Sequence, residues 1–206
     1  MYIASAVFAV LPLLAAAIPT PSSTKSSNTA YTTATASATP FTVMALRSAS
    51  PIHFLQMNAA NTSFWLGGAT RSYCPIDASQ CPPGNVTVFD GPNALSIEVP
   101  GGQQIYVAPS GALGFTQAHT ANMPAGSVIS PITYTPQTGT AYNGVISTSA
   151  FGATGFMACP TTTNNWQVYA AISNATVPTG NLADCLGFDA VTVDWTGANP
   201  EAWQYV

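Results

Sequence analysis

Apolar residues alternate with polar or small residues in a series of short segments between residues 41 and 206. A period of two indicates β-strands that bury one face and expose the other. Gly, Pro, Asn or Ser bound most of these segments, as expected where strands end. In chain order the predicted strands are 41–46, 52–57, 64–66, 86–88, 95–99, 105–107, 127–134, 145–148, 155–159, 166–172 and 190–195. The pattern predicts an all-β domain, a single antiparallel β-sandwich of the jelly-roll or Greek-key kind.

The stretch from residue 84 to 115 shows this alternation clearly, and we expect it to form a three-stranded meander at the centre of the domain. Turn-forming residues at 91–93 and 100–102 separate its strands, because Gly, Pro and Asn supply the dihedral angles of turns. No long window shows a helical period of 3.6 residues. At most a helical turn is expected, at 181–186.

Two segments of different composition precede this domain. Residues 1–17 are predominantly apolar and end in Ala15-Ala16-Ala17, which predicts a cleaved secretory signal peptide. A membrane anchor is the alternative, but the segment is short for a span and contains Pro12. Residues 18–40 are rich in Ser, Thr and Pro, which predicts a disordered stalk, either O-glycosylated or a plain linker. The β-sandwich domain is then expected at 41–206, with no membrane attachment after signal cleavage.

Charge is scarce in this sequence. Charged residues make up 5% of the 206 positions, against about 25% in ordinary soluble proteins. Lys25, Arg47 and Arg71 are the only basic residues, so the clustered cations that bind a nucleic-acid backbone are missing. We therefore expect no nucleic-acid partner, and a surface solvated by hydroxyls, amides and glycans.

Four cysteines in a secreted chain predict two disulfides. The sequence favours Cys74–Cys81, which closes a tight loop, and Cys159–Cys185, which closes a longer one. Nested or crossed pairings remain open. A zinc site is the competing interpretation, but neither a C-x-x-C spacing nor a nearby His pair supports it. No metal or cofactor is expected.

Three N-x-[ST] sequons occur in the predicted domain, at Asn61, Asn85 and Asn174. Pro does not occupy the middle position of any of them. In a secreted chain such sequons are candidate N-glycosylation sites.

Catalytic chemistry is not indicated. His53 is predicted on a sheet face and His119 in a loop, and no hydrolase motif accompanies either. A glycosidase needs two carboxylates at a fixed separation, whereas Asp189 and Asp194 are expected on opposite faces of a strand. The other acidic residues are Asp77, Asp90, Glu98, Asp184 and Glu201. We expect a protein that is not an enzyme.

Binding of a wall polysaccharide such as glucan, chitin or mannan is a stronger alternative. Sugar sites combine exposed aromatic faces with amide or carboxylate groups. Trp166 follows two Asn residues, Trp195 follows Asp194, and Trp203 precedes Gln204. Large rings in a sandwich more often belong to its core or edges.

Several short segments in this order resemble the fungal phialide-development cell wall protein (PhiA) family. The segments are 41–50, 93–97, 102–107, 110–111, 156–160, 166–169 and 184–187. The resemblance implies a secreted, glycosylated wall protein of filamentous ascomycetes that is needed for normal phialide and conidium formation, and some relatives are allergens. It also implies that Cys159 and Cys185 occupy family positions, and it brings no catalytic residues. The alternative is a non-catalytic polysaccharide-binding module or a secreted effector-like or allergen module with the same fold.

Overall fold

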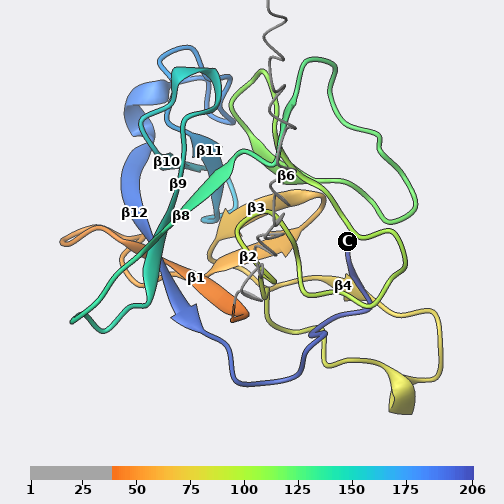
Figure 1. Ribbon diagram of the computed structural model, residues 1–206. Helices are drawn as coiled ribbons and strands as arrows, with labels where there is room; N and C mark the ends of the chain where they lie inside the picture. The colour runs from red at the N-terminus through yellow and green to blue at the C-terminus, as the bar shows by residue number, and fades with distance from the viewer. Residues whose placement is uncertain (1–38) are drawn as a thin grey trace, which may run out of the picture. The chain divides into compact units, whose positions relative to one another are not determined.

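The computed structural model describes residues 39–206 (Figure 1). The predicted signal peptide at 1–17 and all but the last two residues of the predicted stalk at 18–40 lie outside the described residues.

The described residues are almost entirely strands, turns and loops, which confirms the predicted all-β class. The strands are β1 (Phe41–Leu46), β2 (Met57–Ala60), β3 (Ser63–Leu66), β4 (Ser72–Tyr73), β5 (Ile105–Val107), β6 (Leu113–Phe115), β7 (Val128–Ile129), β8 (Ile132–Pro136), β9 (Gly144–Thr148), β10 (Phe156–Pro160), β11 (Trp166–Ala170), β12 (Leu186–Asp194) and β13 (Gln204–Tyr205). Three single turns of 3-10 helix interrupt them: η1 (Ala78–Gln80), η2 (Ala150–Gly152) and η3 (Leu182–Asp184). The last of these lies where a helical turn was expected.

Eleven strands form one curled antiparallel sheet, and β12 is the strand that joins its two halves. The first three residues of β12 pair with β10, which continues through β11, β3, β6 and β5 to β7. The rest of β12 pairs with β1 and β9, and β8 follows β9. Side chains from both halves, such as Phe115 and Ile146, belong to one buried core. In orthogonal sandwiches, a strand that passes from one packed layer to the other forms a corner, and β12 has this place here.

Two predicted strands of the central meander do not form ladders. Residues 86–88 form no bridge, 95–99 form only isolated ones, Leu95 with Phe89 and Ile97 with Ala202, and 105–107 alone is a strand of the sheet. The expected alternation also fails there, because Thr87 and Ser96 are buried. These hydroxyls find internal partners, so the segment is buried without being regularly paired.

Two further strand predictions were wrong in extent. The chain turns at residues 51–54, and β2 begins only at Met57. The predicted strand at 127–134 is split into β7 and β8 around Ser130, whose φ is 50°. A residue in the left-handed region breaks the extended conformation that a continuous strand needs.

The C-terminal segment is anchored inside the fold by polar side chains. The Gln103 side-chain amide donates to the carbonyl oxygens of Thr116 and Tyr205, at 2.9 and 2.8 Å, and its Oε1 accepts from the Tyr205 backbone N–H at 2.8 Å. The Tyr205 hydroxyl donates to the Val86 carbonyl at 2.9 Å. Gln103 is therefore a buried link between the end of the chain and the sheet.

Candidate functional site

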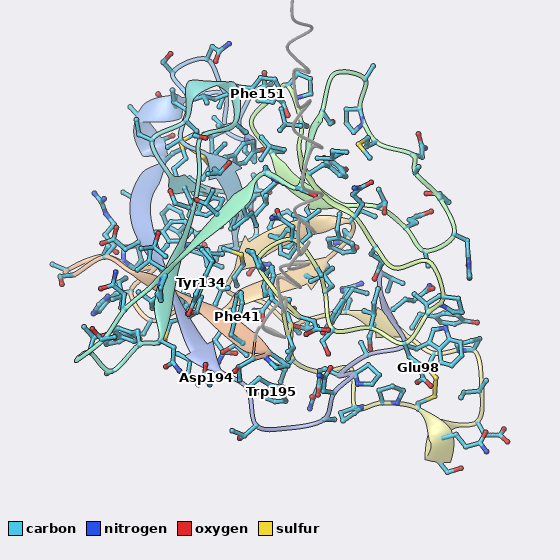
Figure 2. The ribbon with its side chains drawn as sticks, viewed as in Figure 1. Phe41, Glu98, Tyr134, Phe151, Asp194 and Trp195 are labelled. Carbon is cyan, nitrogen blue, oxygen red and sulfur yellow. A yellow bond between two sulfur atoms is a disulfide. The ribbon has the colours of Figure 1, made fainter. Side chains whose placement is uncertain are left out.

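An open groove of about 420 Å³ lies beside the hairpin formed by β8 and β9, next to the start of β1 and the end of β12. Its lining combines aromatic rings with hydroxyl, amide and carboxylate groups: Thr39, Phe41, Pro92, Tyr134, Gln137, Thr140, Tyr142, Asn143 and Asp194. We call this the Tyr134 groove. Figure 2 shows Tyr134, Phe41 and Asp194 together on this side of the sheet.

The hairpin holds Tyr134 in a fixed position. Its hydroxyl donates to the Asn143 carbonyl at 2.9 Å, and the Gln137 N–H donates to the same oxygen at 2.9 Å. The Tyr134 ring lies over Gly144, where an added Cβ would overlap the ring. Glycine is thus required at this position for the ring to lie against the neighbouring strand.

Tyr134 is the outer end of a row of stacked rings that continues into the core. Its ring centroid is 5.8 Å from that of Phe41, which stacks on Phe89 at 5.7 Å, and Phe89 stacks on Phe64 at 5.7 Å. Tyr134 is 39% exposed, whereas Phe41 is 3% exposed. The core therefore supports one aromatic face that remains accessible to a ligand.

The groove has the chemistry of a site for a neutral, hydroxyl-rich ligand. The side chains of Gln137 and Asn143 can donate and accept hydrogen bonds, and Asp194 can accept them from hydroxyls. Asp194 is exposed at the end of β12, where it pairs with Phe41 of β1. No Lys, Arg or His lines the groove, so an anionic ligand would find no counter-charge there.

Asp194 is the one polar residue of this groove to which the sequence pointed. The other binding candidates were not predicted, although two tyrosines within the polar segment 134–143 were a usable signal: Tyr134, Gln137, Tyr142 and Asn143.

The tryptophans considered for sugar binding lie outside the groove lining. Trp166 packs against the main core, and Trp203 is half-buried. Trp195 is half-buried beside Asp194, and its indole N–H donates to the Ala198 carbonyl at 2.8 Å (Figure 2). None of these three rings lines the groove that Tyr134 shares with Gln137, Asn143 and Asp194.

The histidines are separated from the groove. His53, which was expected on a sheet face, lies in the turn after β1, where its Nδ1 accepts from the Arg47 N–H at 3.2 Å and its ring stacks on Phe54 at 3.8 Å. His119 is exposed in a loop, as predicted. Within residues 39–206 no three His, Cys, Asp or Glu side chains gather in a metal-binding group. In the same range no helix is long and apolar enough to cross a membrane.

One carboxylate is buried. Glu201 is 1% exposed, and neither carboxylate oxygen has a hydrogen-bond partner among the described residues. Burial raises the pKa of Glu201, and the nearby backbone amides of Val86 and Asn85 lower it by less. Burial also raises the pKa of Tyr205, and the charge of Glu201 adds to this rise. Neither residue lines the Tyr134 groove.

The structure contains the two disulfides that the sequence favoured. Cys74 is bonded to Cys81, and Cys159 is bonded to Cys185. The first closes an exposed loop that follows β4 and contains η1, and the second joins β10 to the residue that precedes β12.

The three sequon residues, Asn61, Asn85 and Asn174, are all exposed. Asn61 lies in the turn between β2 and β3. Exposure permits glycosylation, which stays a prediction for each site.

Comparison with known proteins identifies relatives of this chain. The family model for PhiA-like secreted proteins matches residues 41–206. A protein of Arthroderma benhamiae named "Uncharacterized secreted protein" is 48% identical over 156 residues, which cover 73% of this chain and 77% of that relative. No solved structure matches significantly. The family resemblance found in the sequence is confirmed.

Proposed function

We propose a non-enzymatic structural role in the fungal cell wall for this chain, which belongs to the PhiA-like secreted protein family. The protein is held in the wall noncovalently, by a neutral polysaccharide such as glucan, chitin or mannan that binds at the Tyr134 groove. Its place is in asexual development, in the formation of phialides and conidia, as the family resemblance implies.

The observation that carries this proposal is the single exposed ring at the end of a buried aromatic stack. A sugar ring that packs on Tyr134 would meet the amides of Gln137 and Asn143 and the carboxylate of Asp194 at the same groove. The aromatic face favours binding of sugar C–H groups, and the polar rim favours binding of their hydroxyls.

The absence of an enzymatic role is supported by the composition of the groove. Hydrolysis of a glycosidic bond uses two carboxyl groups, one as acid and one as base or nucleophile. Asp194 is the one carboxylate in the lining, and Asp189, near the other end of the paired region of β12, lies in a different depression with Arg47. A ligand in the Tyr134 groove would therefore be bound without being cleaved.

Binding of the secreted protein to insoluble glucan, chitin and mannan tests the proposal. Retention on at least one of these polymers is expected, with Tyr134→Ala lowering affinity about tenfold, the value of one aromatic contact. Asp194→Asn should weaken binding less, because the amide keeps the shape and loses only the charge.

Tyr73→Ala is the matched control, because Tyr73 is 53% exposed on β4 and lies outside the groove lining. Equal retention of Tyr134→Ala and Tyr73→Ala would contradict the assignment of the groove. No retention of the unmodified protein on any polymer would contradict polysaccharide binding altogether.

The developmental role is tested separately, by deleting the gene and scoring phialides and conidia. Defective conidiation that is restored by the wild-type chain but not by Tyr134→Ala would link the groove to development. Normal conidiation in the deletion strain would contradict that role.

The alternative is a secreted module that acts outside the wall, as an effector-like protein or allergen. Fractionation discriminates the two: recovery in the wall extract supports the structural role, and recovery only in the culture fluid supports the alternative. Extraction with glucanase and with reducing agent then shows whether polysaccharide or disulfides hold the protein.

A further inference from the structure

A second, smaller groove of about 200 Å³ begins at one of the sequons. Its lining is Ala60, Asn61, Trp65, Gly67, Gly68, Ala69, Arg71, Thr163 and Asn165, and we call it the Trp65 groove. We propose that the N-glycan carried by Asn61 occupies this groove, with its first N-acetylglucosamine packed on Trp65, so that the glycan is a structural part of the β2–β3 hairpin.

The hairpin turn fixes the origin of the glycan. β2 and β3 are joined by the two residues Asn61 and Thr62, with φ angles of 52° and 55°. Positive φ at both central positions defines the type I′ turn, which is the tight turn that suits the twist of a hairpin and readily accepts Asn. Asn61 is exposed and its backbone N–H donates to the Val206 carbonyl at 2.8 Å, so its backbone is held while its side chain is free to carry a sugar.

Trp65 is held so that its ring forms a wall of the groove. Its indole N–H donates to the Ala60 carbonyl at 2.8 Å, immediately before Asn61. The ring is half-buried, and the strand residue pairs with Asn58 on one side and with Gln167 on the other. This pairing leaves an aromatic surface within a short reach of the sequon.

The opposite wall is polar and rigid. The Asn58 side chain donates to the Gly68 carbonyl at 3.0 Å, and its oxygen accepts from the Thr70 hydroxyl at 3.1 Å. Gly68 has a φ of 76°, and an added Cβ would lie 3.2 Å from the Asn165 side chain, so glycine lets this loop approach Asn165. The amide of Asn165 and the cation of Arg71 then face the groove with groups that can bind an acetamide or a hydroxyl.

The size of the groove and the alternative positions for the glycan both favour this placement. Ligand pockets begin at roughly 300 Å³, so the Trp65 groove suits one sugar ring and not a free oligosaccharide. Asn61 also borders a groove toward Gln117 and Gln204, but the aromatic residue of that groove, Tyr205, is 1% exposed and offers no face. Asn85 and Asn174 line neither of these grooves.

The experiment uses the full chain secreted from a yeast host that adds N-glycans. Peptide mass analysis measures occupancy at Asn61. Thermal unfolding compares Ser63→Ala, which removes the sequon and leaves Asn61 in its positive-φ turn, with the control Thr176→Ala, which removes the sequon of Asn174. We expect Ser63→Ala to lower the unfolding midpoint by roughly 2–4 °C, the shift that about 1 kcal/mol gives in a domain of this size, and Thr176→Ala to leave it unchanged. Trimming the glycans to one N-acetylglucosamine should keep the wild-type midpoint.

Trp65→Leu supplies the second arm, because loss of the glycan through Ser63→Ala should lower the midpoint no further in that background. As a readout that does not depend on the stability of this variant, the N-acetyl methyl signal is followed by NMR in the trimmed Asn85→Gln/Asn174→Gln protein. An upfield ring-current shift relative to the isolated glycopeptide supports packing on Trp65. An unoccupied Asn61, equal midpoints for Ser63→Ala and Thr176→Ala, or an unshifted methyl signal would each overturn the proposal.

Discussion

Two regions of the domain are buried to a similar extent and are held together in different ways. In β10, β11 and β12 the backbone forms continuous ladders, and Cys159–Cys185 ties β10 to the chain just before β12. In the stretch 84–104 isolated bridges replace ladders, and the C-terminal residues 201–206 form only the two-residue ladder of β13 with β4. Buried polar side chains supply further partners in both segments. Similar apolar patterns therefore lead to regular pairing in one region and to side-chain anchoring in the other.

The physical reason is the nature of the buried groups. Along β10 the inward side chains include Phe156 and Ala158, which are apolar and need no hydrogen-bond partner. In the other region Ser96 accepts from the Glu201 N–H at 3.0 Å, and Thr87 accepts from the Ala59 N–H at 2.7 Å. Each such side chain satisfies a backbone group that a neighbouring strand would otherwise satisfy. Stability in this region thus depends on individual polar residues.

The largest expected effect tests the ladder region. Replacing Cys159 and Cys185 together by Ala should lower the free energy of unfolding by about 3.5 kcal/mol, because the unfolded chain regains the entropy of the loop that the disulfide closes. Urea denaturation of the purified protein measures the loss. The Cys74→Ala/Cys81→Ala pair is the comparison, with a shorter loop and an expected loss of about 2.5 kcal/mol. A larger loss for the Cys74→Ala/Cys81→Ala pair would show that the disulfide of the exposed loop, and not the one in β10–β12, contributes more to stability.

The next effect tests the polar region. Gln103→Ala removes three hydrogen bonds and leaves buried backbone groups of Thr116 and Tyr205 without partners. We expect a loss of about 2–3 kcal/mol in urea denaturation and faster hydrogen exchange at the end of the chain. Gln104→Ala is the control, since the Gln104 side chain is only half-buried. A small and equal loss for both variants would contradict the role of Gln103 as an anchor.

This contrast also explains which features the sequence could predict. The strand at 41–46 and the strands near 145, 156 and 166 were predicted well, because each is a short, mainly apolar run with glycine, proline or asparagine close to its ends. The predicted strands at 86–88 and 95–99 failed because alternation reports burial, and burial alone does not specify a ladder.

Long-range partners explain why the sequence revealed so little of the site. The Gln103 side chain bonds Tyr205, which is 102 positions away, and Phe41 meets Tyr134 only after β1 and β8 have joined the sheet. The separate residues of the Tyr134 groove carry no motif, so only the fold brings them together. The disulfide pairing was easier to predict, since each pair lies close in the chain.

The smallest expected effect on stability comes from Glu201. It makes the stability of the polar region, which contains Glu201, depend on pH. Its carboxylate is buried with no hydrogen-bond partner among residues 39–206, and burial raises its pKa above the ordinary value of 4.5. Folding therefore favours the protonated carboxyl. Its contribution to the free energy of unfolding is complete below pH 4.5 and is lost as the pH rises through the raised pKa. Glu201→Gln keeps the shape and removes the charge. Its thermal midpoint should equal that of the wild type at pH 3 and exceed it at pH 8.

Glu98→Gln is the matched control for this experiment, because Glu98 is exposed and its N–H donates to the carbonyl of Ala202, the residue after Glu201. An equal gain of Glu98→Gln at pH 8 would show that the gain of Glu201→Gln does not come from burial of its carboxylate. A Glu201→Gln midpoint that falls below the wild type at pH 8 would mean that the ionised carboxylate is stabilising. The polar region would then owe part of its stability to a charge, and its contrast with the ladder region would be electrostatic as well as geometric.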